Sequence, residues 1–408
     1  MKTLSRCCAC MALWIIAAAP SWAQAPSFQF LQTPGPYPVG LNVAELHDGT
    51  RHFPASATSQ GTPTAKLTSR PLQTLVWYPA AKNTASPMTV GDYAALADTE
   101  VAFDKPDPNA NHWRAQLKSS SGAPLWAVRN TPAAQGRFPV VIYAPSDSSV
   151  PWENADLCEY LASHGYVVIA SPSMGASTRD MTDDLEGIET QARDISYLIT
   201  YAASLPHADA SRVAVVSWSW GGISGLFAAA RDRRIDALVA MDGSMRYFPG
   251  LVRKAGYVHA DQMRIPLLFF MEGDVTLPER LDKYYDGPAD DIVGPSVLNA
   301  WVRGDLVTAI MLGMSHGEFG AMAQRRKTAQ RFAEDQVADY GRDDANTGYA
   351  LVAMYTGRFL DAYLKGDAQA ADFLKSKPVD NGAPRHFMAV DFRGAQQEPA
   401  SSANAAGQ

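Results

Sequence analysis

The segment Arg212-Val-Ala-Val-Val-Ser217-Trp218-Ser219-Trp220-Gly221-Gly222-Ile223-Ser224-Gly225 indicates how the chain folds. An apolar run typical of a strand leads directly into a helix rich in small residues, with Ser219 at the junction. This is the context of a nucleophile elbow, G-x-S-x-G, in which the residues two positions from the serine must be small because the strand and helix backbones nearly touch. Ser217 and Gly221 occupy those positions, so Ser217 replaces the usual glycine. The alternative without catalysis is a tightly packed turn or an anion site at a helix N-terminus.

Two other serines of the segment compete with Ser219 for the role of nucleophile. Ser217 is expected to be the last residue of the strand, and Ser224 to lie one turn into the helix. Neither position is the exposed apex of the turn, so the sequence favours Ser219.

Short apolar runs on both sides of this segment are typical of buried strands, and helical patterns lie between most of them. The expected strands are residues 72–78, 139–144, 166–171, 212–216, 237–241, 266–271 and 308–312, and the expected helices are residues 154–164, 186–204, 221–231 and 349–365. Strands that are apolar on both faces and alternate with helices predict an α/β protein with a mostly parallel, doubly wound sheet and helices on both faces.

A serine hydroxyl attacks only when a histidine accepts its proton and a carboxylate fixes the imidazole tautomer. Asp242 follows the expected strand 237–241, and His316 follows the expected strand 308–312 in a loop rich in glycine. Both lie at carboxyl ends of strands, where open α/β sheets place their sites. The order Ser219, Asp242, His316 is that of the α/β-hydrolase fold, which we therefore expect. Glu272 and Asp274 end the next strand and remain alternatives for the acid, with Asp274 the stronger of the two.

Several short motifs follow one another along most of the chain: Gly35-Pro-Tyr-Pro-Val-Gly40, Leu75-Val-Trp-Tyr-Pro79, Phe138-Pro-Val-Val-Ile142, Leu161-Ala-Ser-His-Gly-Tyr166, Ile265-Pro-Leu-Leu-Phe-Phe270 and Ser315-His316. In this order they resemble the dienelactone-hydrolase-like branch of the α/β-hydrolases, which includes the platelet-activating-factor acetylhydrolases. In those acetylhydrolases the acid follows the strand immediately after the nucleophile helix. The resemblance therefore favours Asp242 over Asp274.

The same resemblance implies an oxyanion hole made of two backbone N–H groups, those of Trp220 and Asp147. Relatives usually carry His-Gly after the strand that precedes this loop, whereas this chain reads Ala144-Pro-Ser-Asp-Ser148. Backbone donors do not depend on the side chain, but a carboxylate at Asp147 that faced the hole would oppose the developing negative charge.

The composition excludes several classes of partner. The 408 residues are 47% hydrophobic and 19% charged, with a formal net charge of −7. An acidic chain without runs of Lys or Arg predicts no nucleic-acid partner, because phosphate binding needs clustered cations. The sequence carries no H-E-x-x-H, no Cys/His cluster and no G-x-x-x-x-G-K, so we expect neither a metal nor an organic cofactor.

The first 23 residues have the order of a secretory signal peptide. Lys2 and Arg6 precede the apolar run 11–19, and a stretch of small residues, 18–25, follows it. Cleavage is expected after Ala23, and the apolar run is too short to span a bilayer. The sequence thus predicts export to the periplasm or the extracellular space, and a mature chain without a transmembrane segment.

The rest of the chain is expected to divide into a linker at residues 24–36, a catalytic domain at 37–390 and a disordered tail at 391–408. Residues 82–123 interrupt the strand and helix pattern and are expected to form a surface insertion, a candidate cap over the site.

The predicted function is a secreted serine hydrolase that cleaves small-molecule or lipid-like carboxylic esters through an acyl-enzyme intermediate. Two alternatives stay open. One is a non-catalytic ligand-binding protein on the same fold, suggested by Ser217 and the altered oxyanion segment. The other is a serine peptidase or amidase.

Overall fold

The structure is a computed structural model that describes residues 28–54, 67–106, 111–273, 277–278, 281, 285, 287–326 and 340–396. The strands are β1 (Val39–Pro54), β2 (Leu67–Pro79), β3 (Ala127–Arg129), β4 (Phe138–Ala144), β5 (Val167–Ala170), β6 (Ala208–Trp218), β7 (Ala237–Met241), β8 (Leu267–Glu272), β9 (Leu306–Met311) and β10 (Met388–Arg393). The helices used below are α1 (Val90–Leu96), α2 (Asn111–Gln116), α3 (Ala155–Ser163), α4 (Leu185–Ala202), α5 (Trp220–Arg231), α6 (Pro249–Lys254), α8 (Val297–Ala300), α9 (Ala321–Gln324), α11 (Arg342–Leu364) and α12 (Ala368–Lys375).

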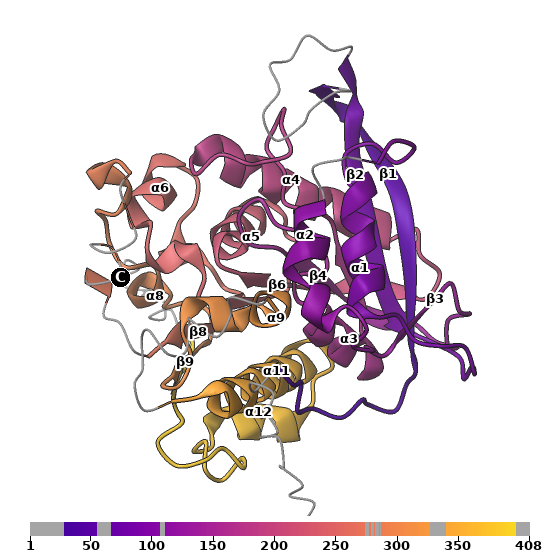
Figure 1. Cartoon of the computed structure of the whole chain (residues 1–408). Coiled ribbons are helices and arrows are strands. Elements are labelled where there is room, and N and C mark those ends of the chain that lie inside the picture. Colours follow the sequence, from indigo (N-terminus) through magenta and orange to yellow (C-terminus); the bar gives the residue numbers. More distant parts are fainter. Residues whose placement is uncertain are drawn as a thin grey trace, which may run out of the picture.

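The ten strands form one sheet in the order β10-β9-β8-β7-β6-β4-β5-β2-β1-β3 (Figure 1). The six strands from β4 to β9 are all parallel to their neighbours within this set. The carboxyl ends of β6, β7 and β9 therefore lie along one edge of the sheet. This topology confirms the expected mostly parallel, doubly wound sheet.

Helices cover both faces of the sheet, which explains why its central strands are apolar throughout. In β4, Val141 and Tyr143 belong to a core cluster that includes residues of α3 and α11. The alternate residues Val140 and Ile142 pack in a second cluster with residues of α4 and α5. Successive side chains of a strand point to opposite faces, so each central strand contributes to both layers.

Strands β1, β3 and β10 were not expected from the sequence, whereas β2 contains the expected strand 72–78, and β10 corrects one domain boundary. Strand β10 pairs antiparallel with β9 from Met388 to Arg393, so residues 391–393, assigned to the disordered tail, belong to the sheet. At the other edge, β1 and β2 form a long antiparallel ribbon (Figure 1). Residues 394–396 follow β10, and the Gln396 backbone N–H donates to the Val302 carbonyl oxygen at 2.8 Å. Residues 397–408 of the predicted tail lie outside the described residues.

Residues 28–36 of the expected linker pack against the domain. The rings of Phe28 and Phe30 contact Tyr349 of α11 at centroid distances of 5.4 and 5.6 Å. The Gly35 backbone N–H donates a hydrogen bond to Ser163 Oγ at 2.9 Å. This part of the expected linker is therefore a folded part of the domain.

The insertion at residues 82–123 contains α1 and α2. From α1, Tyr93 donates a hydrogen bond to the buried Glu159 of α3 at 2.6 Å. From α2, Trp113 packs edge-on against Trp152 with ring centroids 5.2 Å apart. The insertion thus lies beside the start of α3, close to the carboxyl end of β4.

No helix in the described ranges is long and apolar enough to cross a membrane. The expected signal peptide, residues 1–23, lies outside the part of the chain that the structure describes.

Candidate active site

The turn between β6 and α5 holds Ser219 in a strained backbone conformation, with φ 53° and ψ −121°. A non-glycine residue with positive φ is uncommon, and such strain is typical of functional sites. The turn leaves no room for larger neighbours: a Cβ at Gly221 would lie 2.2 Å from the Ala144 carbonyl oxygen. A Cβ at Gly222 would lie 2.6 Å from Gly243 Cα. The small residues noted in the sequence are therefore required by the close approach of the neighbouring backbones.

The two competing serines have other environments. Ser217 is 2% exposed, and its hydroxyl donates to the Val239 carbonyl oxygen of β7 at 2.9 Å. Ser224 is fully buried within α5. Ser219 is half-buried and lines a cavity, so it alone of the three reaches a space that a ligand can enter.

His316 connects Ser219 to Asp242. Its Nε2 lies 2.8 Å from Ser219 Oγ, and its Nδ1 lies 2.5 Å from Asp242 Oδ2. Asp242 directly follows β7 and is fully buried, and His316 begins a short 3-10 turn after β9. The structure thus brings together the three residues that the sequence proposed, at hydrogen-bond distances.

The alternative acids have different positions. Asp274 lies outside the described residues. Glu272 ends β8, and its Oε2 accepts a hydrogen bond from the His316 backbone N–H at 3.0 Å. Glu272 therefore fixes the backbone at His316, while Asp242 contacts the imidazole.

Two further residues support His316 and Asp242, a role that the sequence did not predict for either of them. The Trp218 indole N–H donates to the His316 carbonyl oxygen at 3.2 Å, and its ring lies 5.7 Å from the imidazole. The Tyr247 hydroxyl donates to Asp242 Oδ1. Burial and the charge of Asp242 raise the pKa of Tyr247 well above its usual range, so it remains a donor. Only proximity to Ser219 and Asp242 in the sequence marked these two residues.

The expected oxyanion donors lie beside Ser219. Trp220 is the first residue of α5, and Asp147 lies in the loop after β4; both line a cavity with Ser219 and His316. Asp147 itself is exposed. The surrounding protein removes water from the Asp147 carboxyl group and so raises its pKa to about 6, and the negative charge of Asp183 is the next largest cause.

The loop at residues 145–149 is held by Glu153, which the sequence did not single out. The Glu153 carboxylate accepts hydrogen bonds at 2.7 Å from the Ser146 N–H, the Ser146 hydroxyl and the Tyr143 hydroxyl. Burial raises the pKa of Glu153, and these three donors oppose that effect. The Gln191 side-chain amide donates to the Pro145 carbonyl oxygen at 2.8 Å.

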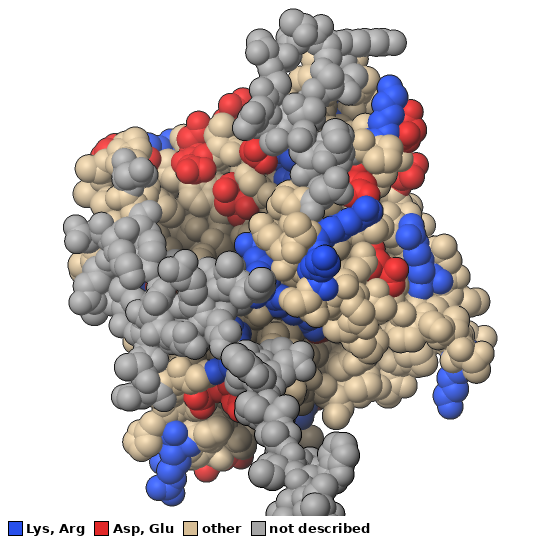
Figure 2. All heavy atoms as spheres, viewed as in Figure 1, with Lys and Arg blue, Asp and Glu red and all other residues tan. Residues whose placement is uncertain are grey.

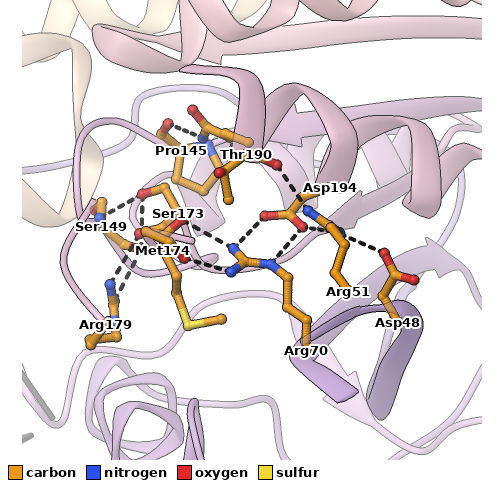
Figure 3. A network of polar contacts seen from close by, with 12 residues as sticks. Asp48, Arg51, Arg70, Pro145, Ser149, Ser173, Met174, Arg179, Thr190 and Asp194 are labelled. Atoms are coloured by element: carbon orange, nitrogen blue, oxygen red, sulfur yellow. Dashed lines mark hydrogen bonds and ion pairs between the residues drawn. The ribbon is translucent and has the colours of Figure 1, made fainter. Parts of the chain in front are cut away.

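A second set of contacts ties the same loop to the segment after β5 (Figure 3). Ser173 Oγ donates to the Ser146 carbonyl oxygen and accepts from the Ser149 N–H at 2.7 Å. The Arg179 guanidinium donates to the carbonyl oxygens of Ser148 and Ser149 and pairs with Glu100 of the insertion at 2.8 Å. Because buried backbone polar groups are held on both sides, the loop is fixed before any ligand binds.

The segment after β5 is itself anchored by buried ion pairs (Figure 3). Arg70 donates to the Met174 and Gly175 carbonyl oxygens at 3.0 and 2.6 Å, and pairs with Asp194 of α4 at 2.8 Å. Asp194 also pairs with Arg51 at 2.5 Å. The ribbon of β1 and β2 thereby supports the loop next to Ser219.

Two hollows meet at Ser219 and His316. The Trp113 hollow, about 450 Å³, is lined by Trp113, Ser146, Asp147, Glu153, Trp218, Met322 and Arg326 among others. The Phe248 hollow, about 380 Å³, is lined by Asp147, Asp183, Trp220, Ser244, Tyr247, Phe248 and Tyr285 among others. A serine between two hollows has room for a ligand that extends in two directions, as the acyl and alcohol arms of an ester do.

The sheet order, the strained elbow at Ser219 and the position of His316 are those of the α/β-hydrolase fold. The sequence profile of the Chlorophyllase family matches residues 99–244, a range that includes Ser219 and Asp242. A ferulic acid esterase from Streptomyces cinnamoneus has a similar solved structure, with a TM-score of 0.57 and 20% sequence identity over 84% of this chain and 94% of that chain. No curated protein matches the sequence significantly. These similarities confirm the α/β-hydrolase fold. The fold is widespread, with 827 significantly matching chains of solved structures, so it does not identify a substrate.

Proposed function

We propose that the protein is a serine hydrolase of carboxylic esters that acts through an acyl-enzyme intermediate. The observation that carries this proposal is the position of His316, with Nε2 2.8 Å from Ser219 Oγ and Nδ1 2.5 Å from Asp242 Oδ2. This is the geometry in which an imidazole accepts a serine proton while a carboxylate orients it.

In the proposed reaction His316 accepts the Ser219 proton as Oγ attacks the ester carbonyl carbon. The resulting oxyanion accepts hydrogen bonds from the backbone N–H groups of Trp220 and Asp147. When the intermediate collapses, His316 returns its proton to the leaving alkoxide, which departs as the alcohol. Water then repeats these steps on the acyl-enzyme and releases the acid. Asp242 stays ionised and holds the imidazolium.

The names of the similar proteins support an ester rather than an amide as substrate. The solved structure is of a ferulic acid esterase, and the matching family is named Chlorophyllase. Two hollows of several hundred cubic ångströms suit a small-molecule or lipid-like ester. The ordered motifs quoted above favour the dienelactone-hydrolase-like branch within the superfamily.

Covalent labelling tests the proposal directly. A fluorophosphonate probe should modify Ser219, located by mass spectrometry, and Ser219→Ala should abolish the adduct and lower turnover by several orders of magnitude. Ser224→Ala is the matched control, because that serine is buried in α5. Failure of the wild-type protein to react would favour the non-catalytic alternative. An adduct on Ser217 would refute the assignment of the nucleophile.

A panel of substrates separates esters from amides. 4-Nitrophenyl esters should be hydrolysed far faster than the matching 4-nitroanilides and peptide amides. Faster turnover of amides would favour the peptidase alternative.

We also propose export, with a mature N-terminus at Gln24. The support is the order of charged, apolar and small residues in the first 25 positions. N-terminal sequencing of protein recovered outside the cytoplasm of its native host tests this. Retention of Met1–Ala23 on that protein would contradict export by cleavage.

A further inference from the structure

Arg326 lines the Trp113 hollow together with Ser219 and His316. It lies two residues after α9, and its guanidinium carbon lies 4.6 Å from the centroid of the Trp113 ring. Arginine stacks well on the face of an indole, and stacking leaves the N–H groups at the edge of the guanidinium plane available as donors. A cation therefore lies in the wall of the same hollow as the proposed nucleophile.

The guanidinium of Arg326 has no acceptor within the part of the chain that the structure describes. Its Nε is buried without a hydrogen-bond partner. The adjacent Arg325 differs, since it forms a two-pronged ion pair with Asp156 of α3 at 2.5 and 2.7 Å. A buried donor without an acceptor is costly, so an arginine left in this state in the wall of the hollow that Ser219 lines calls for an external acceptor.

The carboxylate of Glu153 lines the same hollow but does not neutralise Arg326. It accepts its hydrogen bonds from Ser146 and Tyr143, and its charge acts on Arg326 only at a distance. Burial lowers the pKa of Arg326, yet a guanidinium stays protonated at neutral pH. The guanidinium is therefore partly buried, without a hydrogen bond to a carboxylate in the part of the chain that the structure describes.

Cationic and anionic side chains gather on different parts of the surface around the site. Figure 2 shows Lys and Arg atoms gathered over α2 and α9, while Asp and Glu atoms lie mostly toward α4 and α6. The Phe248 hollow is lined by Asp183 in addition to the shared Asp147. The two hollows thus differ in the charges of their lining residues, and only the Trp113 hollow has a cation in its wall among the residues described for the two.

We propose that Arg326 binds a carboxylate carried by one arm of the ester substrate, with Trp113 supporting the guanidinium. The proposal rests on the ester hydrolysis proposed above and adds the chemical class of the substrate: an ester whose acid or alcohol bears a second, ionised carboxyl group. The planar fork of arginine matches a carboxylate with two parallel hydrogen bonds.

Paired substrates that differ in one charge test this inference. One pair places the carboxylate on the acyl arm: 4-nitrophenyl hydrogen adipate against its methyl ester. The other places it on the alcohol arm: 4-acetoxybenzoate against methyl 4-acetoxybenzoate. The readout is the ratio of kcat/KM for the anionic ester to kcat/KM for its neutral partner, measured at pH 7.5 and low salt.

The wild-type ratio should exceed that of Arg326→Gln by about ten- to a hundredfold for one of the two pairs, the range expected of a charge-assisted hydrogen bond. Arg326→Lys should give an intermediate ratio, because it keeps the charge and loses the fork. Arg233→Gln removes the same charge from an exposed position after α5 and should keep the wild-type ratio. Circular dichroism establishes that each variant is folded.

The inference is overturned if the ratio is the same in the wild type and Arg326→Gln, including the case in which both esters lose activity equally. It is also overturned if Arg326→Gln does not fold and the folded Arg326→Lys keeps the wild-type ratio. If the wild type hydrolyses no ester, the proposed function fails instead. Calorimetric titration with adipate against dimethyl adipate then decides the inference: wild-type binding of adipate that is weakened in Arg326→Lys supports it, and equal or absent binding refutes it.

Discussion

Tyr247 donates a hydrogen bond to Asp242 Oδ1, while His316 contacts the other carboxylate oxygen, Oδ2. Both contacts are made in a fully buried position, where an ionised carboxylate needs donors to offset the loss of water. Tyr247 thus supplies part of the environment in which Asp242 can stay charged and orient the imidazole.

Tyr247→Phe should lower kcat about tenfold with little change in KM. Loss of a hydrogen bond to a buried charge costs about 1.5–3 kcal/mol, and part of that cost should appear in the orientation of His316. Steady-state kinetics on a 4-nitrophenyl ester measure the split between kcat and KM. Tyr166→Phe is the matched control. Tyr166 directly precedes β5, is buried, and donates a hydrogen bond to Asp361 at 2.7 Å. Equal effects of the two substitutions would contradict a positioning role for Tyr247.

The positions of Ser219, Asp242 and His316 were predictable because each follows a buried strand of the parallel sheet. Apolar residues on both faces of a strand leave a strong signal in the sequence, and the parallel arrangement then brings the carboxyl ends to one edge. The elbow was marked by Gly221 and Gly222, whose small size the neighbouring backbones require.

The parts that the sequence did not predict depend on contacts between distant residues or on weak local patterns. β1 alternates between buried and exposed residues and carries charged groups, so it lacked the apolar run of a central strand. Glu153, Arg179 and Ser173 hold the loop at residues 145–149 through contacts that no spacing in the sequence reveals. Arg326 likewise meets Trp113 from more than 200 residues away.

A paired comparison of Asp242→Asn and Asp274→Asn tests the choice of acid. Asp242→Asn should lower kcat by up to about ten-thousandfold, because the amide favours the wrong imidazole tautomer. Asp274→Asn should leave kcat within a fewfold of the wild type and alter the free energy of unfolding by about 1 kcal/mol at most. Ester kinetics and circular dichroism measure both. Loss of activity in Asp274→Asn with an active Asp242→Asn would assign the acid to Asp274.

Glu159 should make the stability of the domain depend on pH. Burial raises the pKa of this carboxyl group to about 8, against hydrogen bonds from Tyr93 and the Trp126 N–H that favour the ionised form. An unfolded glutamate titrates near 4.5, so between about pH 4.5 and 8 the folded state binds one more proton than the unfolded state. This contribution to stability is complete below pH 4.5 and is lost as the pH rises to 8, with a slope of up to about −1.4 kcal/mol per pH unit.

Glu159→Gln should therefore flatten the decline of the free energy of unfolding between pH 5.5 and 7.5, as measured by urea denaturation. Glu186→Gln, an exposed substitution on α4, should keep the wild-type slope. The same slope in Glu159→Gln and the wild type would rule out this role.

Asp147 should slow the proposed reaction at alkaline pH. Its backbone N–H is a proposed oxyanion donor, and its side chain lines both hollows beside Ser219. Because the surrounding protein and the charge of Asp183 raise its pKa to about 6, the carboxyl group is mostly neutral at pH 5 and mostly ionised at pH 8. The ionised form opposes a developing oxyanion, and the neutral form does not.

Asp147→Asn keeps the backbone donor and removes the charge. For a neutral ester, its kcat/KM relative to the wild type should rise from near one at pH 5 to about three- to tenfold at pH 8, the range expected of one like charge near the reacting centre. Taking the ratio at each pH cancels the titration of groups that the two proteins share. Asp183→Asn provides a second check. Removing that charge should lower the pKa of Asp147, so the decline in kcat/KM caused by ionisation of Asp147 should occur at lower pH than in the wild type. A ratio that stays constant from pH 5 to 8, or an Asp147→Asn enzyme slower than the wild type at pH 8, would show that the carboxylate does not act on the oxyanion.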